Sequence, residues 1–229
     1  LQAACVNPVL HYKLPLGLLQ VGDTADFQIV DDLQTLTPRE VWLRGQCVAR
    51  DGVSFLSAGE PVIENRFAAE PIAPADLRIV ARQAQRVRII GVRDGHHLTD
   101  HLQERCPADE GVIGTDPDRD LIKLVVCNRY RPAPPAVALV KGFGLRRGAI
   151  ASSVSHDSHH VIAIGATDEA LAAAVNEVIA LKGGLAVADN NRKILTSFPL
   201  PLAGLMSSGS AETVAHAYGD CDRLAKIMG

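Results

Sequence analysis

The sequence is poor in aromatic residues and has no strong excess of either charge. Phe, Trp and Tyr make up 4% of the 229 residues, and the net charge is −3. A nucleic-acid-binding domain usually carries a basic patch, so this composition argues against a nucleic-acid partner. Hydrophobic residues make up 47% of the chain, mainly as Val, Ile, Leu and Ala, which suits a core of mixed strands and helices.

The sequence also lacks long apolar runs and cysteine pairs with the spacing of metal ligands. No run approaches the roughly 18 apolar residues that span a membrane, and no signal peptide is visible. The cysteines are odd in number and contain no C-x-x-C pair, which argues against a disulfide framework and a zinc ribbon. We therefore expect a cytoplasmic protein with reduced thiols. The five cysteines are Cys5, Cys47, Cys106, Cys127 and Cys221.

The first 60 residues predict the end of a helix followed by a small β unit. Asn7-Pro8 is expected to break the helix, because the residue before proline avoids the helical region. Residues 25–30 alternate between apolar and polar, which predicts a strand, and residues 40–52 predict a strand, a turn and a second strand. No catalytic cluster is evident in this part of the chain.

Residues 61–76 predict a linker that separates two domains. The stretch contains Pro61, Pro71 and Pro74 and has weak hydrophobic periodicity. The second domain is expected to cover residues 77–229. Short apolar or alternating stretches predict four of its strands, at residues 86–92, 120–127, 136–140 and 160–165.

The clearest helix is predicted over residues 168–182. Thr167 can cap its N-terminus, and Gly183-Gly184 can end it by supplying a left-handed position. A hairpin around residues 189–191 and a last helix over roughly 210–228 complete the prediction. The expected fold class is α+β, with a small antiparallel β-sandwich portion followed by a mixed-sheet α/β-type C-terminal domain. Strand order does not follow from the sequence.

Two stretches resemble a known family. Asn7-Pro8 followed by Gly17–Asp31 resembles the return from the last barrel helix into the small β-sandwich of the amidohydrolase superfamily. The longer stretch Val140–His159 resembles the C-terminal domain of bacterial adenine deaminases, and two further stretches match the same domain. They are Gly183–Val187 and Phe198–Ser207. His160 departs from the family, which usually has Asn at this position.

The resemblance implies the following for a complete enzyme. It would convert adenine and water to hypoxanthine and ammonia, with a binuclear manganese or iron centre in a (β/α)8 barrel. Its partners would be adenine, the N-terminal barrel domain and further copies of itself. Residues 1–60 would then hold the end of the last barrel helix and part of the β-sandwich, and residues 77–229 the C-terminal domain.

The resemblance also implies that this chain lacks the catalytic barrel. The His-x-His pair expected on the first barrel strand does not occur, and the sequence begins at Leu1 without a Met, as a fragment would. The H-x-E and P-C-x-x-C motifs of the zinc-dependent nucleobase deaminases do not occur either. We therefore expect these 229 residues to be inactive alone.

The segment around His156–His160 is the predicted functional site, with three roles open. It could be a lid that reaches the barrel active site, it could bind a metal, or it could be a hydrogen-bonded turn without chemistry. The lid is favoured, because the segment is too polar for a core. The candidate lid residues are His156, Asp157, His159, Ser152 and Ser153, and the candidate metal ligands are His156, Asp157 and His159.

Other polar patterns are weaker. His97 and His101 have the i, i+4 spacing of a helical metal site, but a turn and a strand precede them, so we expect surface histidines. The glycines of Lys141–Gly148 fit no phosphate-binding motif. The alternative function is a non-catalytic oligomerisation or substrate-lid module of another amidohydrolase, such as a relative of hydantoinase or imidazolonepropionase.

Overall fold

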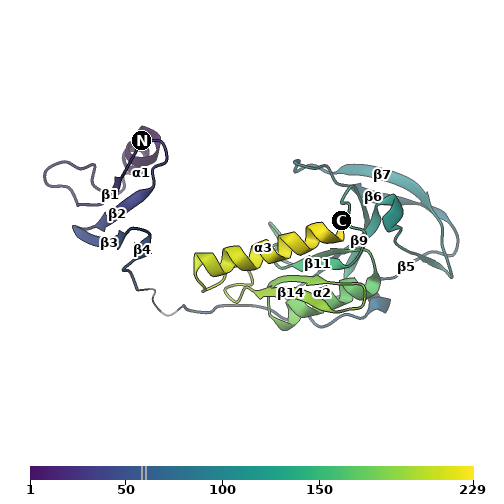
Figure 1. The fold of residues 1–229 in the computed structure, drawn as a ribbon. Coiled ribbons are helices and arrows are strands. Elements are labelled where there is room, and N and C mark those ends of the chain that lie inside the picture. Colours follow the sequence, from purple (N-terminus) through teal and green to yellow (C-terminus); the bar gives the residue numbers. More distant parts are fainter. Residues whose placement is uncertain (58, 60) are drawn as a thin grey trace. The chain divides into compact units, whose positions relative to one another are not determined.

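The chain folds into two compact units, residues 1–60 and residues 61–229, in a computed structural model (Figure 1). The structure describes residues 1–57, 59 and 61–229. Ala58 and Glu60, which belong to the predicted first domain, lie outside the described residues.

The first unit is a short helical segment and a four-stranded antiparallel sheet with the order β1-β2-β3-β4. Phe27 of β1 stacks on Trp42 of β2, with ring centroids 5.8 Å apart. No side chain among the described residues of this unit is buried. Its elements are a π-helix (Gln2–Val6), α1 (Asn7–Tyr12), β1 (Phe27–Val30), β2 (Pro38–Leu43), β3 (Gln46–Arg50) and β4 (Val53–Ser54).

The helical segment of the first unit corrects one prediction. The chain does not leave the helix at Asn7-Pro8, because α1 continues to Tyr12. Pro8 lies in the first turn of α1, where a missing N–H and a fixed φ are tolerated. The strand predictions at residues 25–30 and 40–52 are confirmed by β1, β2 and β3.

The second unit is built on an eight-stranded mixed sheet with the order β14-β13-β11-β12-β9-β10-β6-β7. β10 and β6 run parallel, and every other neighbouring pair is antiparallel. The strands of this sheet are β6 (Gln85–Gly91), β7 (Asp100–Cys106), β9 (Leu121–Cys127), β10 (Ala136–Lys141), β11 (Ala149–Ser152), β12 (Val161–Gly165), β13 (Gly184–Ala188) and β14 (Ile194–Pro199).

The remaining elements of the second unit are two helices, two 3-10 turns and a two-stranded sheet. They are η2 (Pro74–Leu77), β5 (Ile79–Val80), β8 (Val112–Ile113), η3 (Pro117–Arg119), α2 (Asp168–Ala180) and α3 (Ala211–Met228), with β5 and β8 paired. The whole is of the α+β class, as predicted. No helix among the described residues combines the length and the apolar character that crossing a membrane requires.

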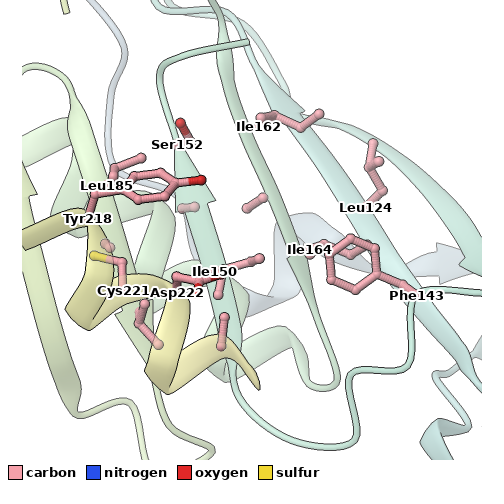
Figure 2. Close-up of a pocket in the computed structure, with 15 residues that line it drawn as sticks. Leu124, Phe143, Ile150, Ser152, Ile162, Ile164, Leu185, Tyr218, Cys221 and Asp222 are labelled. Carbon is pink, nitrogen blue, oxygen red and sulfur yellow. The ribbon is translucent and has the colours of Figure 1, made fainter. Parts of the chain in front are cut away.

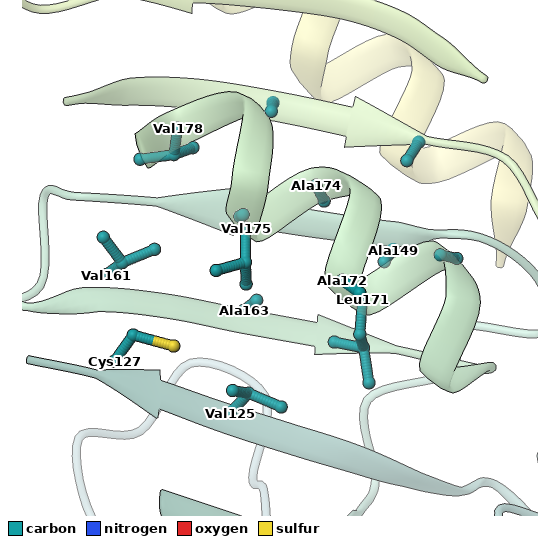
Figure 3. Close-up of a cluster of buried hydrophobic side chains, with 14 of the residues drawn as sticks. Val125, Cys127, Ala149, Val161, Ala163, Leu171, Ala172, Ala174, Val175 and Val178 are labelled. Atoms are coloured by element: carbon teal, nitrogen blue, oxygen red, sulfur yellow. The ribbon is translucent and has the colours of Figure 1, made fainter. Parts of the chain in front are cut away.

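The two faces of the large sheet carry one helix each. α3 crosses one face over β13 and β14 and leaves an apolar pocket beside it (Figure 2). α2 packs across the other face, where alternate residues of β9, β11, β12 and β13 meet its apolar side (Figure 3). Leu171, Val175 and Val178 of α2 are fully buried there, each contributing about 1.5–3 kcal/mol of apolar burial.

Local signals explain where α2 begins and ends. Thr167 Oγ1 accepts a hydrogen bond from Ala170 N at 3.2 Å, which satisfies one free donor of the first turn. At the other end Gly183 and Gly184 have φ of +116° and +153° and lead directly into β13. A side chain at Gly184 would lie 2.3 Å from Phe198 O, so only glycine permits this close pairing with β14.

The stretch predicted as a linker between two domains belongs to the second unit and packs against its other elements. Residues 61–73 contain no regular secondary structure, but Ile72 exchanges two hydrogen bonds with the Asn176 side chain of α2, at 2.8 and 2.9 Å. Ala68 N donates to Arg129 O at 2.6 Å, and Phe67 packs against the core under α2. Residues 61–73, which we call the strap, therefore join the start of the second unit to the end of β9.

Candidate functional site

The candidate site lies at one end of the eight-stranded sheet. Val161 of β12 pairs with Cys127 of β9, so the start of β12 lies beside the end of β9. Antiparallel pairing likewise brings the end of β11, the start of β13 and the end of β14 to this edge. The connecting loops that meet here are residues 128–135, 153–160, 181–183 and 200–206. The end of the sheet thus gathers parts of all three stretches that carry the C-terminal-domain resemblance.

The predicted loop joins β11 to β12, and its tip is open to solvent. The side chains of His156 and Asp157 are 87% and 88% exposed, and His156 Nδ1 lies 2.5 Å from Asp157 Oδ1. His159 is half-buried, with its ring edge-on to that of His156 at 6.2 Å. His159 N donates to Ser155 O at 2.5 Å and closes the turn. The tip therefore presents an imidazole and a carboxylate to solvent.

The two serines at the base of the loop have structural partners. Ser153 is fully buried, and its Oγ accepts from Gly184 N at 2.8 Å and donates to Gly204 O at 2.5 Å. Ser152 ends β11 half-buried, and its Oγ accepts from Val154 N at 3.0 Å. Ser153 therefore ties its own loop to the start of β13 and to the loop at residues 200–206, while the exposed tip residues lie farther along the chain.

Arg129 and Tyr130 also belong to the site, and sequence reasoning missed them. Arg129 is 4% exposed, and it donates through Nη1 to Ala203 O at 2.5 Å and through Nη2 to the Tyr130 hydroxyl at 3.1 Å. Its guanidinium also lies 4.8 Å from the centre of the Tyr130 ring. The Tyr130 hydroxyl in turn lies 3.4 Å from Ser158 O, and its ring contacts His160 edge-on.

Arg129 is unusual because no described carboxylate forms an ion pair with it. A buried cation without a counter-ion is costly, so carbonyl and aromatic contacts must hold it in place. Together with Tyr130 it connects the predicted loop to the loop at residues 200–206. No sequence pattern distinguishes this arginine from the exposed Arg131 two residues later.

The described residues do not gather a metal-binding group. Nowhere in residues 1–57, 59 and 61–229 do three or more His, Cys, Asp or Glu side chains come together in a way that could hold an ion. His156, Asp157 and His159 therefore do not converge as a three-ligand set. His97 and His101 are both exposed, as expected for surface histidines. They do not share a helix, because His101 lies in β7.

Neither the glycine-rich stretch nor the buried thiols offer catalytic groups. Gly142 N and Gly144 N both donate to the Asp120 carboxylate at 2.8 Å, so these amides are occupied rather than open to a phosphate. Burial raises the pKa of the Cys127 thiol to about 11 and also raises the pKa values of Cys106 and Cys221. These thiols stay protonated at neutral pH and are poor nucleophiles.

Taken together, the fold defines a mixed-sheet α+β domain that follows a separate antiparallel β unit and carries a polar loop without a metal centre. Residues 96–229 match the adenine deaminase C-terminal domain family, and the chain belongs to it. The resemblance drawn from the sequence is therefore confirmed.

Curated relatives match the chain over nearly all of its length. Adenine deaminase of Salinibacter ruber is 48% identical over 219 residues, which cover 95% of this chain and 39% of that protein. Those of Parabacteroides distasonis and Methanosarcina barkeri are 41% and 37% identical over the whole chain and cover 41% and 42% of the relative. The chain thus spans about two-fifths of the length of these relatives.

Proposed function

We propose that this chain is the C-terminal portion of an enzyme that deaminates adenine to hypoxanthine and ammonia. The observation that carries the proposal is the identity of 37–48% to proteins named adenine deaminase over nearly the whole chain. The buried thiols and the exposed loop give no complete catalytic set, so the chemistry at C6 of the purine is assigned to the remainder of the polypeptide.

A binuclear manganese or iron centre in that remainder would supply a hydrolytic water. The residues of this chain do not fit such a centre, because its described part holds no group of three ligands. We therefore assign no metal ligand to His156, Asp157 or His159. Their proposed role is contact with the purine or with the mouth of the active site.

The geometry that supports a lid role is a polar tip on a rigid base. Ser153 and Arg129 are buried and hydrogen-bonded to neighbouring loops, whereas His156 and Asp157 project into solvent. A loop of this kind can position an imidazole and a carboxylate with little loss of conformational entropy on contact.

The test compares the complete protein with residues 1–229 alone, each supplied with Mn²⁺ or Fe²⁺. Hypoxanthine is measured by chromatography and ammonia by a coupled assay, with adenosine and guanine as control substrates. We expect the complete protein to turn over adenine and the 229 residues to show no turnover. If the complete protein turns over no adenine with either metal, the proposed substrate is wrong. If the 229 residues alone turn over adenine, the proposal that the catalytic residues lie outside this chain is wrong.

A further inference from the structure

The face of the large sheet that carries α3 is only partly covered. α3 lies over β13 and β14, and beside it a pocket of about 340 Å³ opens over the middle of the sheet (Figure 2). We call this pocket the α3 groove. Its floor consists of apolar side chains from β9, β11, β12 and β13. They are Leu124, Ile150, Ile162, Ile164 and Leu185.

Aromatic side chains stand on both rims of the α3 groove. Tyr218 projects from α3 and is 61% exposed, and Phe143 projects from the loop after β10 and is 42% exposed. The chain has only nine aromatic residues of the Phe, Tyr and Trp types, so two at one pocket is a notable share. Aromatic residues are enriched in the buried centres of protein interfaces.

The backbone around Phe143 is held firmly. The two Asp120 carboxylate oxygens accept one hydrogen bond each from Gly142 N and Gly144 N, both at 2.8 Å. Gly142 has φ of +90°, and a Cβ there would lie 2.5 Å from Val92 O. A ring held out to solvent on a fixed backbone loses little entropy when a partner covers it.

The groove carries almost no free charge. Among the described residues that line it, Asp222 is the charged one, and Lys226 Nζ donates to its carboxylate at 2.7 Å. An apolar protein surface therefore suits this groove better than an anionic ligand or a nucleic acid.

We propose that the α3 groove is the docking surface for the part of the same polypeptide that lies outside this chain. More than half of the length of the matched relatives lies outside it. Covalent linkage makes the encounter of such a segment with the groove intramolecular, which favours it over a free second copy. The inference concerns assembly and does not depend on adenine being the substrate.

The first test measures whether the groove is covered in the full-length protein. Single cysteines replace the two rim residues and a distant exposed control, as Phe143→Cys, Tyr218→Cys and Leu98→Cys, and alkylation is followed for each peptide by mass spectrometry. In the chain alone all three positions are exposed, at 42%, 61% and 77%. We expect the two groove positions to react about tenfold more slowly than position 98 in the full-length protein. Equal rates would overturn the proposal.

The second test identifies the occupant. A photoreactive benzophenone amino acid is placed at position 143, or at position 218 if the first variant does not fold, in a mixture of isotopically heavy and light full-length protein. We expect cross-links within one molecule to peptides outside residues 1–229. Cross-links between heavy and light chains would assign the groove to a second copy, and cross-links to residues 1–57 would assign it to the first unit. Either result would overturn the proposal, whether or not the protein deaminates adenine.

Discussion

At the scale of single residues, two buried polar side chains hold the candidate site together, Ser153 and Arg129. Each has backbone partners that are distant in the sequence, at Gly184 and Gly204 for the serine and at Ala203 for the arginine. A buried polar group is tolerated only when it is hydrogen-bonded, so these contacts restrict how the loops can move.

Ser153→Ala is expected to destabilise the second unit without touching the exposed loop tip. The change leaves Gly184 N and Gly204 O without their serine partner in a fully buried place, which costs about 2–4 kcal/mol. Urea unfolding measures the loss. Ser158→Ala, at an exposed position of the same loop, is the matched control and should change the free energy of unfolding by less than about 0.5 kcal/mol. Equal effects of the two changes would contradict this account.

Cys127 predicts a specific dependence of stability on pH. Burial raises the pKa of its thiol from 9.0 to about 11, so the folded protein keeps this proton after the unfolded chain has lost it. Between these pH values the unfolded state binds fewer protons, and the free energy of unfolding therefore falls as the pH rises, by about 2–3 kcal/mol for this group.

The measurement compares urea unfolding of the wild type and Cys127→Ala from pH 8 to pH 11. The variant loses a buried side chain and is less stable throughout, but its stability should fall less steeply with pH. Cys5→Ala, at an exposed position, should follow the slope of the wild type. Parallel curves for all three proteins would show that Cys127 ionises equally easily in the folded and unfolded states.

Secondary-structure elements were predictable where one local pattern sufficed. α2 follows from its caps, α3 was predicted over nearly its observed range without a cap, and β9 and β12 follow from their apolar runs. β7 was missed because it is a sheet-edge strand in which five of the seven residues are charged or polar, so no apolar–polar alternation marks it. β11 was missed because it has only four residues, mostly small.

The candidate site was predictable only in part, for a physical reason. The polar loop at residues 156–160 stands out locally, because its side chains do not suit a core. The residues that support this loop do not stand out, because β11 pairs with β13, which is distant in the sequence. The burial of Arg129 and the shape of the α3 groove likewise depend on strand pairing. No short sequence pattern encodes such pairing.

The loop between β11 and β12 gives a prediction for the full-length protein under the proposed function. If its tip contacts the purine or the mouth of the active site, His156→Ala combined with His159→Ala should lower kcat/KM for adenine by about ten- to a hundredfold. The His156 side chain is 87% exposed, and Nδ1 of the half-buried His159 has no hydrogen-bond partner among the described residues, so thermal stability should change little. Steady-state kinetics and a melting curve on the same samples measure both.

His101→Ala is the matched control for this loop, because His101 is an exposed histidine on β7. It should leave both kcat and KM as they are in the wild type. If the double variant also keeps both constants, the loop has no part in the reaction and only its structural role remains.

At the scale of the whole molecule, the two units differ sharply in how much they bury. The second unit has three clusters of buried apolar side chains, two on the faces of the large sheet and one around β6 and β10. The described residues of the first unit have no buried side chain, although apolar ones such as Leu19, Leu33 and Phe55 are present. Since apolar burial is the main favourable term in folding, the units should differ in independent stability.

Residues 61–229 are therefore expected to fold alone, and residues 1–60 are not. Produced separately, residues 61–229 should show a cooperative thermal transition by circular dichroism, because the core under α2 and the strap at residues 61–73 are both retained. Residues 1–60 should show a gradual change without a transition, because an isolated small sheet without a buried face is marginal in water. A cooperative transition of residues 1–60 would mean that this unit forms a core of its own. Loss of the transition in residues 61–229 would mean that the second unit depends on the first.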